Sequence, residues 1–109
     1  MIYEVIFFIS NRGENLVQNF IDFQDQPTKS KYARLAALLI QYGPALHFPY
    51  SRKLTDNLYE LRSHGDTKIR IIYTRIDQKY VLLHAFKKKT LKTPQKEINT
   101  AEKRRLTLI

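Results

Sequence analysis

The chain has 109 residues and no cysteine. A domain of this size buries only about two-thirds of the surface of its unfolded chain, and small secreted domains are usually reinforced by disulfides. We therefore expect one cytoplasmic domain over residues 1–109. The longest aliphatic run, residues 35–40, is far shorter than the ~20 apolar residues that span a bilayer, so no membrane anchor is expected.

The formal net charge of +9 arises entirely in the C-terminal half of the chain. Residues 1–51 contain four basic and four acidic side chains, whereas residues 52–109 contain 15 basic and six acidic ones, a difference of nine. A one-sided excess of this kind is typical of proteins that bind polyanions, of which nucleic acids are the commonest. The alternative is a basic surface that serves only solubility.

The first half of the chain predicts one strand and two helices. Residues 2–9 are rich in β-branched and aromatic side chains and predict a buried strand. Apolar residues at helical spacing then predict a helix over residues 14–25. A second helix follows with Thr28 as its N-cap. Gly43-Pro44 ends that helix, because glycine tolerates a left-handed cap and proline blocks extension.

The second half changes to the two-residue period of β-strands. Three runs, residues 58–64, 68–76 and 79–86, are separated by short turns that suit antiparallel hairpins. Thr93-Pro94 then opens a last helix, with the threonine as its cap. This order predicts an α+β fold in which an N-terminal strand and a helical hairpin pack on an antiparallel sheet with a C-terminal helix.

Alternation along the three strands predicts which side chains share a face of the sheet. The apolar face is expected to form the core beneath the helical hairpin, and it comprises Tyr59, Leu61, Ile69, Ile71, Val81 and Leu83. The opposite face is expected to be open, and it comprises Arg62, Arg70, His84 and Phe86, with Lys88 continuing the same alternation. A β-bulge would shift such an assignment by one residue.

The side chains of the expected open face suit the cleavage of RNA by its own 2′-hydroxyl. Arginine stabilises charge on a phosphate through its planar, bidentate fork. A histidine such as His84 is suited to proton transfer near neutral pH. An exposed ring such as that of Phe86 can stack on an unpaired base. This chemistry needs no metal, and the sequence has no cluster of histidines and carboxylates with ligand spacing.

The same residues also have purely structural interpretations. Arg62 is able to pair with Glu60 or Asp66 at the surface. His84 would equally suit a hydrogen-bonded position in the interior, and Phe86 a position beneath the last helix. The lysines after the last strand would then form only a solvated basic loop.

Four segments of the C-terminal half form a known pattern. They are Leu58-Tyr59-Glu60-Leu61-Arg62, Arg70-Ile71-Ile72-Tyr73, Val81-Leu82-Leu83-His84-Ala85-Phe86 and Lys88-Lys89-Thr90-Leu91-Lys92-Thr93-Pro94. Together they resemble the phage-derived, HigB-like branch of the RelE/ParE toxin superfamily, over about residues 52–104. The Lys-Lys-Thr-x-Lys-Thr-Pro stretch after a Leu-Leu-His-x-Phe strand is fairly specific, whereas the Tyr-x-Leu-Arg strand alone is a weak signal.

The resemblance implies the toxin of a type II toxin–antitoxin system. Such a toxin is an mRNA endoribonuclease that generally acts on the translating ribosome, without a metal or other cofactor. Its expected partners are mRNA, the ribosome and a cognate antitoxin, which we expect to be a helix-turn-helix DNA-binding protein.

The resemblance also implies roles for individual residues. In RelE-like proteins, basic residues on the central strands and after the last strand act on the scissile phosphate, and the matching positions are Arg62, Arg70 and the Lys88/Lys89 pair. Many such enzymes carry a tyrosine near the final helix, but no tyrosine follows Tyr80 here. The general base therefore stays open, with His84 as the leading candidate and a lysine as the second. The predicted catalytic residues are Arg62, Arg70, His84 and Lys88, and the predicted RNA-binding residues are Lys53, Phe86, Lys87, Lys89 and Lys92.

Two other functions stay open at this point. One is a ParE-like toxin, which shares the fold but poisons DNA gyrase and cuts no RNA. The other is a nucleic-acid-binding regulatory protein of phage origin without catalytic activity. The basic face favours the ribonuclease over the gyrase poison, and a binding protein would bind nucleic acid without cleavage and cause no growth arrest when expressed.

Overall fold

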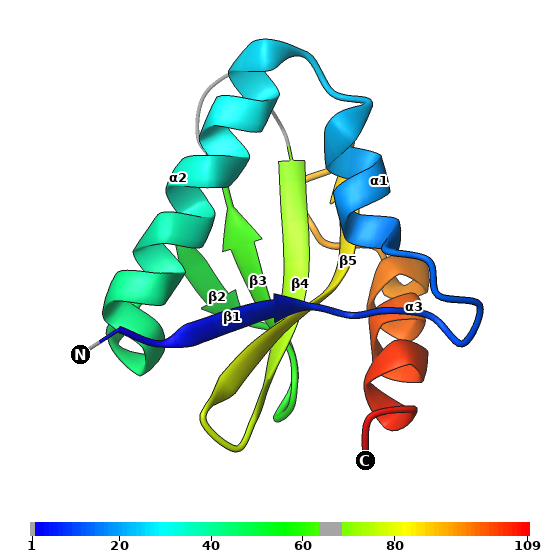
Figure 1. The fold of residues 1–109 in the computed structure, drawn as a ribbon. Helices are drawn as coiled ribbons and strands as arrows, with labels where there is room; N and C mark the ends of the chain where they lie inside the picture. Colours follow the sequence, from blue (N-terminus) through cyan, green and yellow to red (C-terminus); the bar gives the residue numbers. More distant parts are fainter. Residues whose placement is uncertain (1, 64–68) are drawn as a thin grey trace.

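The computed structural model describes residues 2–63 and 69–109. In this part of the chain, five strands form one sheet with the order β1-β5-β4-β3-β2, and helices lie on both of its faces (Figure 1). The strands are β1 (Glu4–Phe7), β2 (Ser51–Lys53), β3 (Tyr59–Arg62), β4 (Ile69–Ile76) and β5 (Lys79–Lys87). The helices are α1 (Leu16–Asp22), α2 (Gln26–Tyr42) and α3 (Gln95–Leu106), with a 3₁₀ turn at Gly43–Ala45. This confirms the predicted α+β class, and the arrangement is consistent with a RelE-like fold.

The sheet separates two apolar cores. The helical-hairpin core lies between the sheet and α1–α2, and its buried residues include Val17, Leu35, Leu39, Leu61, Ile71 and Leu82. The α3 core lies on the opposite face, and its buried residues are Phe8, Leu58, Ile72, Val81, Leu83, Phe86 and Ala101. The face that was expected to be open is therefore covered by α3 over β4 and β5.

β1 adds an edge strand to the sheet, and it pairs with β5 in parallel while the other neighbouring strands pair antiparallel. A parallel pair of strands needs a long connection, and here the chain between β1 and β5 forms the helical hairpin and the strands β2 to β4. β1 is shorter than the predicted strand of residues 2–9. Among the described residues, no helix is long and apolar enough to cross a membrane.

A β-bulge between β4 and β5 changes the predicted faces. Ile72 lies opposite His84 and Tyr73 lies opposite Leu82, so Leu83 has no partner residue on β4. Side chains of β5 before the bulge are consequently displaced by one position relative to simple alternation. The sequence prediction placed Val81 and Leu83 in the core beneath the helical hairpin. This was wrong, because both residues pack in the α3 core.

Gly43 caps the C-terminus of α2 as predicted, with a φ of 50°, but both predicted N-caps were wrong. The Asp25 side chain accepts a hydrogen bond from the Thr28 amide at 2.9 Å, so Asp25 is the N-cap of α2 and Thr28 lies in the first turn. As a result α1 ends at Asp22, earlier than predicted. Pro94 occupies the N-cap position of α3, and the Thr93 side chain makes no capping bond.

β2 was not predicted at all. It has only three residues and pairs only with β3. A run of this length is too short to show a two-residue period. The predicted strand ends at His64 and Lys68, and the possible Arg62 partner Asp66, lie outside the described residues.

Candidate phosphate-binding site

A group of basic side chains surrounds a buried carboxylate at the β2–β3–β4 edge of the sheet, on the face that carries α3. Glu60 is fully buried (0% exposed) in the middle of β3. Arg52 on β2 lies directly opposite Glu60, and Arg62 on β3 lies opposite Arg70 on β4. Strand pairing and the two-residue period thus bring all four side chains to one face.

The three arginines approach the same oxygen of the carboxylate. Arg52 Nη2 and Arg70 Nε are each 3.8 Å from Glu60 Oε1, and Arg62 Nε is 3.9 Å from it. The other oxygen, Glu60 Oε2, accepts a hydrogen bond of 2.6 Å from the Thr93 hydroxyl. We call Arg52, Glu60, Arg62 and Arg70, together with Lys88, the arginine cluster.

Several polar atoms of the arginine cluster make no hydrogen bond within the described part of the chain, although they are buried: Glu60 Oε1, Arg62 Nε and Arg70 Nε. The guanidinium of Arg70 is otherwise held by the backbone, since its Nη1 donates to the carbonyls of Ser63 (3.3 Å) and Ile69 (2.9 Å). A buried donor without an acceptor costs free energy until an acceptor reaches it. The unsatisfied N–H groups therefore suit the oxygens of a bound anion.

Access to the arginine cluster comes from the β2 side. The exposed fraction of the side chain rises from 8% for Arg70 through 17% for Arg62 to 39% for Arg52. Thr93 is buried, accepts a hydrogen bond of 3.3 Å from Arg52 Nη2 and anchors the segment between β5 and α3 against the cluster. An anion that enters from solvent therefore meets Arg52 first and Arg70 last.

Lys88 lies in that segment, one residue after β5, and is partly buried. Partial burial lowers the pKa of its ammonium, the Arg70 and Arg62 guanidiniums lower it further, and Glu60 offsets part of this effect. Burial likewise lowers the pKa of the Arg70 guanidinium, and Glu60 opposes that shift. The cluster holds four basic side chains and one carboxylate, which leaves an excess of three positive charges when all are ionised.

His84, predicted as a catalytic residue, lies beside α3 and not in the arginine cluster. Its Nε2 donates to Glu97 Oε1 at 2.9 Å, and its Nδ1 is 3.4 Å from Arg104 Nη1. Burial lowers the pKa of the imidazole more than the hydrogen bond to Glu97 raises it. Both ring nitrogens contact side chains of α3, so His84 makes the contacts of a structural residue.

Phe86 had two interpretations, base stacking and a position beneath the last helix, and the structure shows the second. The ring is only 6% exposed, packs in the α3 core and stacks on His84 with ring centroids 5.5 Å apart. The reason is α3, which covers this part of the sheet. An aromatic side chain that is exposed at the arginine cluster is Phe48, whose ring lies 5.2 Å from the Arg62 guanidinium carbon.

The four lysines predicted to bind RNA are all exposed, but they occupy different places. Lys53 lies opposite Tyr59, which packs against the helical-hairpin core, and its Nζ is 3.6 Å from Asp56. Lys87 lies opposite Ile69, also of that core. Neither therefore shares a face with the arginine cluster, whereas Lys89 and Lys92 lie in the segment that carries Lys88.

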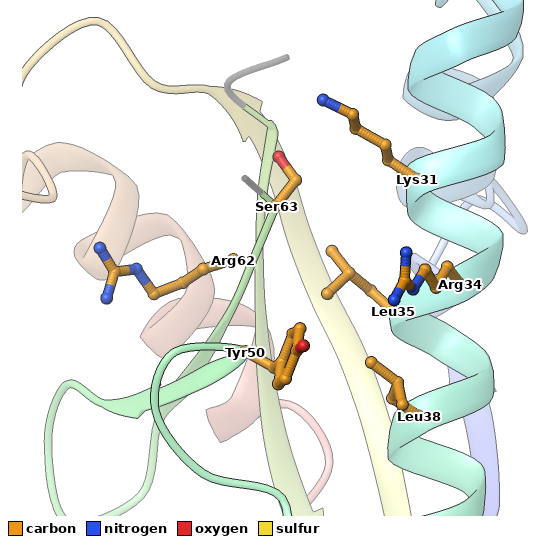
Figure 2. A pocket seen from close by; sticks show the side chains of 7 residues that line it. All are labelled: Lys31, Arg34, Leu35, Leu38, Tyr50, Arg62 and Ser63. Carbon is orange, nitrogen blue, oxygen red and sulfur yellow. The ribbon is translucent and has the colours of Figure 1, made fainter. Parts of the chain in front are cut away.

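A hollow lies on the other face of the sheet, between α2 and the end of β3 (Figure 2). It has a volume of about 140 Å³ and is lined by Lys31, Arg34, Leu35, Leu38, Tyr50, Arg62 and Ser63. Figure 2 shows that the Arg62 side chain leaves β3 on the side away from α2. The hollow and the arginine cluster thus lie on opposite faces of the sheet, and Arg62 belongs to both.

Sequence reasoning found Arg62, Arg70 and Lys88 but missed Arg52 and treated Glu60 only as an optional surface partner. Arg52 escaped because β2 was not recognised. The burial of Glu60 could have been suspected from the sequence. Glu60 lies two residues before Arg62, on the same face of the strand, and the residues on either side of it, Tyr59 and Leu61, are largely apolar. No group of three or more potential metal ligands among histidine, cysteine, aspartate and glutamate occurs in the described residues.

The sequence similarity to a known protein family covers most of the chain. No curated protein matches it. The model of the family described as phage-derived protein Gp49-like (DUF891) matches residues 19–106, which include β2 to β5, α2 and the whole arginine cluster. The chain therefore belongs to the Gp49-like family of phage-derived proteins, a RelE/toxin-like family.

Proposed function

We propose that this protein is a HigB-like toxin that cleaves mRNA at the arginine cluster. The observation that carries the proposal is the convergence of Arg52, Arg62, Arg70 and Lys88 on one partly open site with unsatisfied N–H groups. Preorganised cations and donors of this kind stabilise the charge that develops on a phosphate during its displacement. The family membership supports the toxin class, and the cluster supports the chemistry.

In the proposed reaction, the 2′-oxygen of one nucleotide attacks the adjacent phosphorus and the P–O5′ bond breaks. The products are a 2′,3′-cyclic phosphate and a 5′-hydroxyl, and the 5′-oxygen takes its proton from solvent. Arg52 and Arg62 hold the nonbridging oxygens, with Arg70 behind them. Neutral Lys88 accepts the 2′ proton, which a lowered pKa favours. No cofactor takes part in this scheme.

The remaining elements of the proposal follow the resemblance. The substrate is mRNA, the reaction takes place on the translating ribosome in the cytoplasm, and a cognate antitoxin with a helix-turn-helix DNA-binding domain restrains the toxin. An excess of positive charge in the C-terminal half suits a ribosomal RNA surface and an acidic antitoxin segment alike.

The proposal is tested by induced expression in a bacterial host, with growth and mRNA 5′ ends followed over time. We expect growth arrest and new 5′ ends inside reading frames for the wild-type protein. Arg62→Gln and Lys88→Met should each reduce cleavage by about 100-fold or more, as removal of one oxyanion-stabilising or proton-transferring group does. Arg70 is less suitable, because its substitution also removes buried bonds to the backbone.

Lys79→Met is the matched control, since it removes one exposed lysine at the turn between β4 and β5. This variant should arrest growth as the wild type does. Arrest with intact mRNA would contradict the ribonuclease proposal and favour a gyrase poison. Absence of arrest with soluble, folded protein would favour a nucleic-acid-binding regulator.

A further inference from the structure

Phe48 is exposed beside the arginine cluster. The ring is 64% exposed, although a large apolar side chain usually loses free energy when it faces water. It is held in the turn before β2, where the amides of Tyr50 and Ser51 both donate to the His47 carbonyl, at 3.0 Å and 3.1 Å. The His47 Nδ1 is also 2.7 Å from the Phe48 carbonyl oxygen. The ring is thus presented on a hydrogen-bonded turn.

The position of Phe48 relative to Arg62 is specific. The Arg62 guanidinium carbon lies 5.2 Å from the ring centroid, within the range of a cation–π contact. The same guanidinium has its Nε 3.9 Å from Glu60 Oε1. One arginine therefore connects the exposed ring to the centre of the arginine cluster.

We propose that Phe48 is the platform on which an unpaired nucleobase stacks when the adjoining phosphate occupies the arginine cluster. The inference rests on the proposed function for the identity of the phosphate, and it adds a base-binding subsite. Stacking on an aromatic ring accepts every base, because each base has a π-face. The subsite therefore requires a single-stranded, unstacked nucleotide and does not select a sequence.

The absence of tryptophan from the chain allows a direct test. Phe48→Trp yields a protein with one tryptophan at the proposed subsite. Phe23→Trp is the matched control, because Phe23 is 89% exposed at the end of α1, outside the arginine cluster. The probes are a single-stranded 2′-O-methyl oligonucleotide, which lacks the attacking hydroxyl, and the same oligonucleotide with abasic positions. Binding is measured independently by the anisotropy of a fluorophore on the oligonucleotide.

The intact oligonucleotide should quench the tryptophan emission of the Phe48→Trp protein and leave that of the Phe23→Trp protein unchanged, and the abasic one should quench neither. Phe48→Ala should weaken binding of the intact oligonucleotide by about five- to 150-fold, the usual effect of losing one stacked base. Its affinity for inorganic phosphate should stay within about twofold of wild type, which would show that Arg62 keeps its place.

The outcomes separate the inference from the proposed function. Saturating binding of the oligonucleotide to the Phe48→Trp protein without quenching of its tryptophan would overturn the base-stacking subsite alone. Quenching by an oligonucleotide, together with the absence of new mRNA 5′ ends after induced expression of the wild-type protein, would support the subsite and overturn the ribonuclease. Failure of the wild-type protein to bind the oligonucleotide at all would overturn both.

Discussion

At the scale of single residues, Glu60 sets the properties of the arginine cluster. A fully buried carboxylate is costly unless cations or donors compensate it, and here three arginines and the Thr93 hydroxyl do so. The arginine nitrogens lie 3.8 to 3.9 Å from Glu60 Oε1, which is too far for a hydrogen bond, so the charge of the carboxylate is only partly compensated. Glu60 therefore keeps the guanidiniums together without saturating them, and they retain donors for a second anion.

The identity of the general base is a prediction at this scale. If neutral Lys88 accepts the 2′ proton, the cleavage rate should rise with pH as the ammonium loses its proton, with an apparent pKa below the ordinary lysine value of 10.5. Lys88→Arg keeps the positive charge but cannot be deprotonated, so the rate should fall by about 100-fold or more and the rise should disappear. The measurement is a pH–rate profile for the purified protein and a defined mRNA bound to purified ribosomes.

His84→Gln is the discriminating comparison for that profile. The imidazole is bonded to Glu97 and contacts Arg104, so glutamine should lower stability by about 1 kcal/mol while the rise of the rate with pH persists. Loss of the rise in His84→Gln, with Lys88→Arg unaffected, would show that histidine is the base after all.

At the scale of elements, the helix α3 determines which part of the predicted face is available. Ala101 is 0% exposed and lies in the α3 core with Phe86. Arg104 extends this contact, because its Nη1 donates to the Leu83 carbonyl at 2.8 Å. The helix thus buries the β4–β5 side of the face and leaves the β2–β3 side for the arginine cluster.

The packing of α3 makes a stability prediction. Ala101→Leu inserts a larger side chain where no space exists, and it should lower the free energy of unfolding by about 1–3 kcal/mol. Lys103→Leu places leucine at an exposed position of the same helix and should change it by no more than about 0.5 kcal/mol. Denaturant unfolding of both variants measures the difference, and equal midpoints would mean that α3 is not tightly packed.

These elements also show how far sequence reasoning reached. The three helices and four of the strands have periodicities long enough to recognise, and alternation placed Arg62 and Arg70 side by side because β3 and β4 pair regularly there. Alternation assigned Val81 and Leu83 to the wrong face, since the β-bulge depends on how β4 and β5 fit together and not on either strand alone. The burial of Phe86 was one of two interpretations that the sequence left open, because periodicity does not say which face a terminal helix will cover.

At the scale of the whole molecule, charge and structure divide at the same point of the chain. Residues 1–51 have no net charge and form β1 and the helical hairpin, whereas residues 52–109 carry the whole excess and form most of the sheet with α3. The arginine cluster is built only from the second part. The first part supplies a core and, at its end, the exposed ring of Phe48.

This division predicts the salt dependence of RNA binding. Each phosphate that is neutralised on a single strand contributes about −0.7 to the slope of log K against log salt concentration, because counterions are released. For a 2′-O-methyl oligonucleotide, Lys88→Met should make the slope shallower by about 0.7. Lys79→Met, at the turn between β4 and β5, should leave it unchanged. Equal slopes for Lys88→Met and Lys79→Met would mean that the RNA follows the general basic surface and bypasses the arginine cluster.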